Sequence, residues 1–215
     1  LKSEIKDGLI IFDIGSTLFW NLADITQTKH FLKITVVDID KTGLQIAKER
    51  GLNILYASVL ELPIKDSQVD IVLCLDLLEH VEEGDALIKE ISRVLKKDGK
   101  VILTTPMQNG VSFPFLSKQK IETINKSWGH IQKGYSLENI EELFRNNNLK
   151  IIKTSKYFNF LSRLAYWFNS FSGIHLKGKS LLYRMVIRLE PYIKWGSEEH
   201  IIVGYKKECN YLWTV

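Results

Sequence analysis

Four short apolar runs constrain the fold of this 215-residue chain more than any other feature. They are rich in β-branched residues and lack polar alternation, which is typical of strands buried on both faces of a parallel sheet. Three of them end in an aspartate. The runs cover residues 9–13, 34–38, 70–76 and 100–105.

Helical segments separate these runs. Residues 43–50 and 82–95 carry apolar positions at helical spacing, and the second segment places Leu87, Ile91 and Val94 on one face. Strands that alternate with helices predict an α/β fold with right-handed crossovers, here a Rossmann-like doubly wound seven-stranded sheet. The expected strands are 9–13, 34–38, 54–57, 70–75, 100–105, 149–155 and 200–206.

The second half of the chain adds two elaborations to this single domain, residues 1–215. Residues 106–135 predict a lid-like loop region with one short helix near 121–125, and a loop this long in a compact domain is usually functional. Ser136 is expected to cap the next helix, which should end near Asn146. Residues 157–195 predict two amphipathic helices, a helical cap inserted before the last strand.

The formal net charge of +4 is unevenly distributed. Residues 1–100 are net acidic and residues 101–215 are net basic. The basic half indicates either a solvated surface or an anionic partner, such as a lipid surface or an acidic substrate. No signal peptide or membrane span is recognisable, and Cys74 and Cys209 stand far apart, so we expect a reducing compartment and a cytoplasmic protein.

Five sequence motifs, taken in order, resemble a known family. They are Asp13-Ile14-Gly15, 37–40, 61–70, 76–81 and 90–99. Their order and spacing resemble the class I S-adenosylmethionine-dependent methyltransferases, especially the small-molecule (type 11) group that includes ubiquinone and menaquinone biosynthesis enzymes. The resemblance implies an antiparallel last strand, S-adenosylmethionine as cofactor, and a small or lipid-like acceptor. Nucleic acid is not expected as a partner, and the oligomeric state is left open.

Two residues have physical reasons to bind such a cofactor. A glycine after the first strand, Gly15, lets the backbone approach a ligand closely. Asp38 follows it by 23 positions, near the spacing of about 20 in nucleoside-binding βαβ units, and can accept hydrogen bonds from ribose hydroxyls. The competing role for Asp38 is a helix N-cap, a function that Asp40 could perform instead.

The resemblance implies further cofactor contacts. Asp13 would hold the amino-acid end of the cofactor, although it could instead stabilise a turn. The remaining candidates are Ile39, Ser58, Val59 and Asp76. Two departures weaken the match, because the family has glycines where Thr17 and Phe19 stand, and often an acid where Ser58 stands. Because of these departures, the alternative is that the chain is a non-catalytic binding protein with the same fold.

His80 and His130 are the candidate catalytic residues. On a helical turn His80 would share a face with Asp76 and Glu79, and some quinone O-methyltransferases that this segment resembles use such groups near a divalent metal. We nevertheless assign no metal, and a structural hydrogen-bonding role for His80 competes with the catalytic one. His130 lies in the lid-like loop and could be a base or a surface residue. Tyr135 is a candidate acceptor-site hydroxyl.

Two further hypotheses concern the cofactor and the cap. A nicotinamide-dependent (NAD) oxidoreductase would need a G-x-G-x-x-G motif after the first strand, and only Gly15 is present. The aromatic, basic cap could form a dry roof over the strand ends together with residues 106–135, or could contact an anionic membrane. A structural cap without a ligand role is the alternative.

Overall fold

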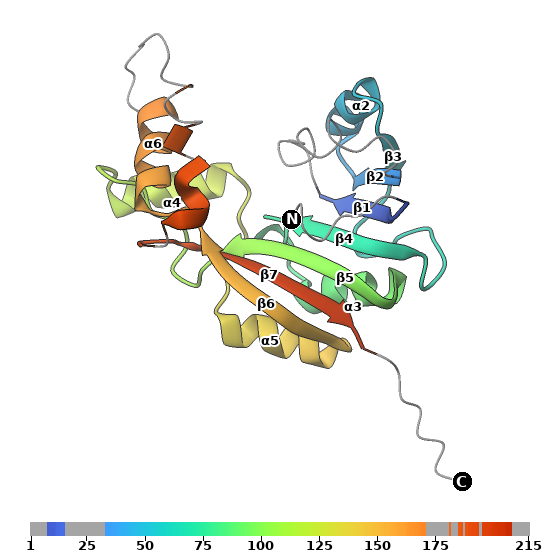
Figure 1. Cartoon of the computed structure of the whole chain (residues 1–215). Helices are drawn as coiled ribbons and strands as arrows, with labels where there is room; N and C mark the ends of the chain where they lie inside the picture. Colours follow the sequence, from blue (N-terminus) through green and yellow to red (C-terminus); the bar gives the residue numbers. More distant parts are fainter. Residues whose placement is uncertain are drawn as a thin grey trace.

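The computed structural model describes residues 8–15, 33–170, 181, 185–186, 188–193 and 195–207 (Figure 1). Thr17 and Phe19, where the glycine motif departs from the family, lie outside these residues. Seven strands form one sheet with the order β3-β2-β1-β4-β5-β7-β6. The strands are β1 (Ile10–Ile14), β2 (Lys33–Asp38), β3 (Asn53–Tyr56), β4 (Val69–Leu75), β5 (Leu95–Pro106), β6 (Leu149–Tyr157) and β7 (Glu199–Lys206).

The strand directions confirm the predicted topology. Strands β1 to β5 pair in parallel, whereas β7 runs antiparallel to both β5 and β6. All seven predicted strands are present. The largest difference is in β5, which begins at Leu95 because Leu95 pairs with Val69 ahead of an irregular stretch of β5, and regular pairing resumes between Ile71 and Lys100.

Apolar runs without alternation are explained by two cores, one on each face of the sheet. Along β4, Val72 and Cys74 join one buried cluster, and Ile71 and Leu73 join the other. Successive side chains of a strand point to opposite faces, so a strand covered on both sides has no polar positions. The chain therefore has the doubly covered sheet that its sequence indicates.

The helices of the described residues follow the expected order. They are α2 (Lys41–Glu49), α3 (Gly84–Val94), α4 (Lys118–Ser127), α5 (Leu137–Asn146) and α6 (Phe160–Ser170), with short 3₁₀ turns η1 (Leu78–His80) and η2 (Glu190–Tyr192). Ser136 caps α5 as predicted, since its Oγ accepts from the Asn139 N–H at 3.1 Å. Helix α4 is longer than expected and is capped by Ser117, which accepts from the Lys120 N–H.

Hydrogen bonds of two charged side chains, Glu90 and Arg93, attach the loop between β3 and β4 to helix α3. Arg93 donates to the Leu62 and Ile64 carbonyls at 3.0 and 2.8 Å, and to both Glu90 and Asp66. Glu90 also accepts from the Leu62 N–H at 2.6 Å. The family-like segment 61–70 is therefore held by side-chain hydrogen bonds, where no regular secondary structure could satisfy its backbone.

The cap between β6 and β7 is attached through buried polar groups. Arg163 of α6 pairs with Glu198 at 2.8 Å and donates to the carbonyls of Ser112 and Gly196. Asn159, before α6, donates to the Ile193 carbonyl at 2.8 Å. These bonds join the cap to the loop after β5 and to the start of β7. Within the part of the chain that the structure describes, no helix combines the length and apolarity needed to cross a bilayer.

Candidate functional site

The candidate site lies where parallel strands end. Asp13 is in β1, Asp38 ends β2, and Asp76 follows β4 directly. These strands are neighbours in the order β2-β1-β4, so their carboxyl ends meet at one edge of the sheet. Ligands of doubly wound sheets bind at this edge. The sequence-predicted carboxylates therefore share the edge where a nucleoside cofactor would lie.

Gly15 occupies a position that requires glycine. Its φ is +69°, in the left-handed region, and its N–H donates to the Val37 carbonyl at 2.8 Å. A Cβ here would stand 2.4 Å from a methyl carbon of Leu77. The left-handed backbone conformation favours glycine, and any side chain here would also have to displace the end of the Leu77 side chain. The close approach of a cofactor to Gly15 stays a prediction, and in this structure the neighbouring group is Leu77 from the turn after β4.

Asp38 and Asp40 divide the two roles that the sequence allowed. Asp40 accepts from the Thr42 and Gly43 N–H groups, so it is the N-cap of α2. Asp38 is buried, and its Oδ1 accepts from the Asp40 N–H at 2.8 Å. The capping role is thus filled by Asp40. Asp38 keeps the position at the strand end that a ribose-binding carboxylate needs.

The other predicted cofactor contacts differ in exposure. Ile39 is among the exposed large apolar residues, whereas Asp13 is fully buried. Ser58 is exposed, and its Oγ accepts from the Leu60 N–H at 3.2 Å in a local turn. Val59 packs against the core. The structure thus places Ile39 and Ser58 at the surface after β2 and β3, and these roles stay predictions.

Asp76 is the centre of a polar network that the sequence did not predict. Its φ is +49°, its Oδ1 accepts from Thr104 Oγ1 at 2.6 Å, and Tyr157 donates to the same carboxyl at 2.9 Å. The carboxyl reaches solvent, yet the surrounding protein desolvates it enough to raise its pKa. Glu199, at the start of β7, is buried beside Tyr157, and burial raises the pKa of Glu199 well above its ordinary value.

Glu79 lies deeper in the same region. Only 1% of it is exposed, and its carboxyl accepts from Thr105 Oγ1 at 3.1 Å. Burial, and then the negative charge of Asp76, raises its pKa to about 8. Glu79 therefore holds a proton at neutral pH.

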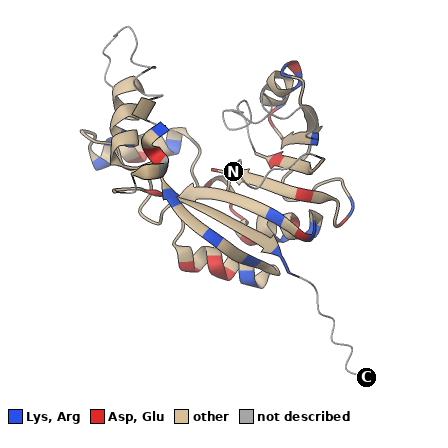
Figure 2. Cartoon of the chain, in the orientation of Figure 1, with Lys and Arg blue, Asp and Glu red and all other residues tan. Residues whose placement is uncertain are grey.

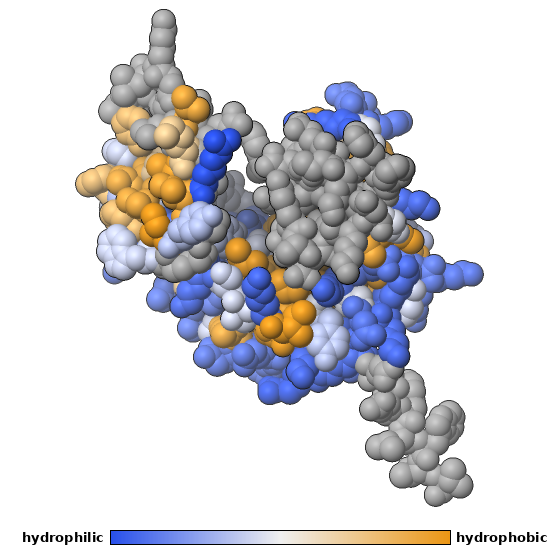
Figure 3. Space-filling model, in the orientation of Figure 1, coloured by the Kyte–Doolittle hydropathy of each residue, from blue (hydrophilic) through white to orange (hydrophobic). Residues whose placement is uncertain are grey.

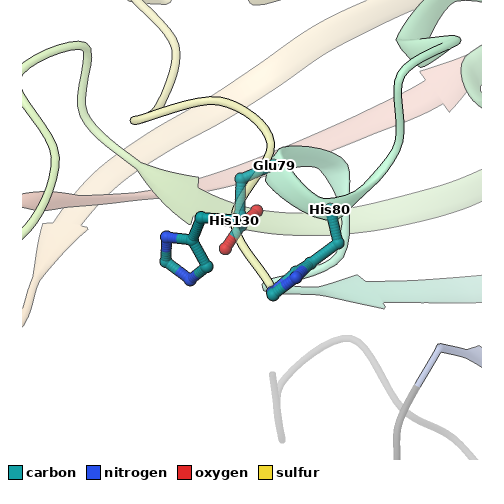
Figure 4. A group of neighbouring side chains, drawn as sticks. All are labelled: Glu79, His80 and His130. Carbon is teal, nitrogen blue, oxygen red and sulfur yellow. The ribbon is translucent and has the colours of Figure 1, made fainter. Parts of the chain in front are cut away.

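His80 and His130 meet although 50 residues separate them. Their ring centroids lie 4.7 Å apart with an edge-to-face orientation, and Figure 4 shows both rings beside the Glu79 carboxyl. The backbone explains the encounter, because the Glu79 carbonyl accepts from the Ile131 and Gln132 N–H groups at 2.9 and 3.1 Å. Burial, and then the nearby His80, lowers the pKa of His130 to about 4. His130 is therefore neutral at neutral pH.

The same three side chains could hold a divalent metal. Ligand atoms of Glu79, His80 and His130 all lie within 4.8 Å of one another. Two imidazoles and one carboxylate suit zinc and similar ions, and Nδ1 of His130 is buried with no hydrogen-bond partner in the described structure. The residues thus fit a metal. The cluster contains His130 and not Asp76, which the sequence placed on one face with Glu79 and His80. The Asp76 carboxyl accepts hydrogen bonds from Thr104 and Tyr157 instead.

Two tyrosines contact the segment that follows β4. Tyr135 is buried, and its hydroxyl donates to the Leu78 carbonyl at 3.4 Å, so it supports the turn before His80. Tyr157 contacts Asp76 directly, but nothing in the sequence marked it. Its position at the end of β6 becomes informative only once β7 is known to lie between β5 and β6.

The raised pKa of Glu79 predicts a pH dependence of stability. The folded carboxyl keeps its proton up to about pH 8, whereas the unfolded one loses it near its ordinary value of 4.5. The folded state binds more protons in this window, so stability should fall as pH rises from about 4.5 to 8. Glu79→Gln should reduce this loss by a few kcal/mol at most, since one pKa unit is about 1.4 kcal/mol.

Urea unfolding at pH 5, 7 and 9 would measure the effect, with Glu82→Gln, an exposed position nearby, as the control. An identical pH dependence for the wild-type and Glu79→Gln proteins would show that Glu79 is ionised in the folded state.

Comparisons with known proteins agree with this geometry. Residues 12–103 match a family model described as methyltransferase domain. An uncharacterized protein of Methanocaldococcus jannaschii is 31% identical over 56% of this chain and 57% of its own length. A ubiquinone biosynthesis O-methyltransferase of Coxiella burnetii is 34% identical over 47% of this chain and 45% of its own. The chain thus spans about half the length of these curated relatives.

A solved structure extends the likeness in fold to nearly the whole chain. It is phosphoethanolamine N-methyltransferase 2 of Haemonchus contortus in complex with S-adenosyl-L-methionine. It superimposes with a TM-score of 0.67 at 19% identity, over 95% of this chain and 50% of that one. The antiparallel β7 and this superposition show that the chain has the fold of S-adenosylmethionine-dependent methyltransferases, and its residues 12–103 are similar to a methyltransferase domain.

Proposed function

We propose that the chain transfers the methyl group of S-adenosylmethionine to a hydroxyl of a small or lipid-like acceptor. The observation that carries this proposal is the His80–His130 pair, placed beside buried acids next to the turn that follows β4. A hydroxyl with a high pKa needs a base for methylation, and imidazole is the usual one. The likeness to an O-methyltransferase supports the same acceptor atom.

The cofactor would occupy the edge formed by β1, β2 and β4. Asp38 would accept hydrogen bonds from the two ribose hydroxyls, because it stands at the end of β2 with the N-cap role left to Asp40. Asp13 would lie toward the amino-acid end of the cofactor. Ile39 is exposed next to Asp38, where an apolar side chain can cover the adenine ring.

His80 and His130 together would bind one proton at a time. A second proton would place two cations with ring centres 4.7 Å apart, and His80 already lowers the pKa of His130. Nδ1 of His130 is buried and has no partner among the described residues, so an acceptor hydroxyl would have to displace part of the surrounding loop before it could donate to this nitrogen. As the oxygen–methyl bond forms and the sulfur–methyl bond breaks, the hydroxyl proton passes to the pair and neutral S-adenosylhomocysteine leaves.

A metal at Glu79, His80 and His130 is a second version of the same function. A divalent ion there would lower the pKa of a hydroxyl bound to it, and so replace the base. The two versions use the same imidazole nitrogens and exclude each other. Dialysis against a chelator separates them, because only a metal-assisted reaction is lost with the ion and restored by adding it back.

The cofactor role of Asp38 is testable by binding. Asp38→Ala should weaken S-adenosylmethionine binding by about 1.5–3 kcal/mol, the scale of hydrogen bonds to a charged group. Isothermal titration calorimetry measures this loss directly. Asp40→Ala is the matched control, because it removes the α2 cap, costs about 1 kcal/mol of stability and should leave the affinity nearly unchanged. Equal affinities of the Asp38→Ala and wild-type proteins would remove the ribose role.

The catalytic role of the pair is testable by kinetics. His130→Gln and His80→Gln should each lower kcat by about 10²–10⁴-fold, the usual contribution of a positioned base, without changing S-adenosylmethionine affinity. The assay follows S-adenosylhomocysteine released with an alkylated phenol, an alkylamine or a fatty acid as acceptor. Gln132→Ala is the control, because this exposed side chain lies next to the pair in the loop.

Only the phenol should respond to loss of the histidines. Turnover of the phenol at the same rate by the wild-type and His130→Gln enzymes would contradict the base role, and turnover of the amine but not of the phenol would contradict a hydroxyl acceptor while leaving methyl transfer intact.

A further inference from the structure

The described residues just before η2 expose a set of large apolar side chains, called the stripe here. Residues 181, 185–186 and 188–189 are helical. Leu181, Met185 and Leu189 are 62%, 56% and 51% exposed, and Tyr192 beyond them is 84% exposed. Steps of four, four and three residues place these side chains on one face of a helix. A helix that only covered a core would turn this face inward.

The stripe continues onto the neighbouring surface. Trp195 is exposed beyond η2 and its ring lies 5.0 Å from that of Phe160, the first residue of α6. Leu161, next along α6, and Phe115, before α4, are exposed as well. Figure 3 shows apolar residues gathered over α6 and the adjoining segment. Most of the exposed large apolar residues in the described part of the chain belong to this cap and to the loop region 107–135.

Charge indicates which kind of surface the stripe fits. Arg188 is exposed and stands three residues after Met185 and four before Tyr192, so it lies on the stripe face. Glu190, the only acid in residues 158–195, accepts from the Asn159 N–H and from Ser162, which ties it to the base of α6. Lys118 and Lys120 begin the neighbouring α4, and Figure 2 shows basic residues on this part of the molecule.

We propose that this cap surface binds peripherally to anionic membranes, with the stripe in the headgroup region and Arg188 at lipid phosphates. An apolar stripe with aromatic residues at its end and cations beside it is the pattern of an interfacial helix. Such helices gain affinity from apolar burial and from attraction to anionic lipids together. The inference does not depend on methyl transfer, since it concerns recruitment to a surface, and it would bring a lipid-like acceptor to the enzyme.

Vesicle co-sedimentation of the whole chain tests the proposal. The protein should sediment with mixed phosphatidylcholine–phosphatidylglycerol vesicles, much less with phosphatidylcholine alone, and less at physiological salt, because exposed charges are screened beyond about 8 Å there. Met185→Glu should lower partitioning about tenfold, since it removes apolar burial and adds a repelled charge. Arg188→Gln should lower it about fivefold, the effect of one cation near an anionic leaflet.

Matched controls come from the opposite end of the molecule. Ile152→Glu changes an apolar residue that is also 51% exposed, on β6, and Arg145→Gln changes an exposed arginine on α5. Both should partition as the wild type does. Calorimetry with S-adenosylhomocysteine verifies that each variant is folded and separates this result from the proposed catalysis.

Three outcomes would overturn the proposal. They are absence of vesicle binding, equal binding to neutral and anionic vesicles, and equal loss in Met185→Glu and Ile152→Glu. Sedimentation velocity adds a fourth. A dimer that Met185→Glu dissociates would show that a second copy of the chain covers the stripe instead of lipid.

Discussion

The Glu79 carbonyl oxygen accepts two backbone hydrogen bonds, from Ile131 and Gln132, and the candidate site depends on them. They hold the loop after α4 against the turn after β4 and so bring His130 to His80. Without these two bonds, His80 would stand beside the carboxyl ends of the strands without a second histidine next to it. Burial of this contact disfavours negative charge on Glu79, because Glu79 loses water and lies near the Asp76 carboxyl. The pKa of Glu79 is therefore raised, and the carboxyl is protonated at neutral pH.

Most of the fold could be predicted because its rules are local. A strand buried on both faces must be apolar throughout, a strand end must turn, and Asp40, Ser117 and Ser136 cap helices with their own side chains. The antiparallel β7 was different, since only the resemblance to a family indicated it. The start of β5 at Leu95 could not be predicted, because it depends on an irregular pairing of β5 with β4 between Leu95 and Lys100.

The site could be predicted in part. The sequence allowed Asp40 to cap α2 in place of Asp38, and the structure shows that Asp40 does so, while the ribose role of Asp38 stays a prediction. The pairing of His80 with His130 was not predictable, since each was a candidate by itself and only the packing of the loop joins them. Tyr157 and Glu199 gave no signal either, because a polar residue at a strand end is common and its partners come from distant strands.

Under the proposed function the cap would serve two needs, a dry surface near the reacting groups and access to an apolar acceptor. The proposed function depends on the carboxyl ends of β1, β2 and β4 binding S-adenosylmethionine, which is the central claim. Calorimetric titration of the chain with S-adenosylhomocysteine and, separately, with NAD tests it most directly. The account predicts saturable one-to-one binding of S-adenosylhomocysteine and no heat of binding with NAD. Binding of NAD, or of neither compound, would contradict it.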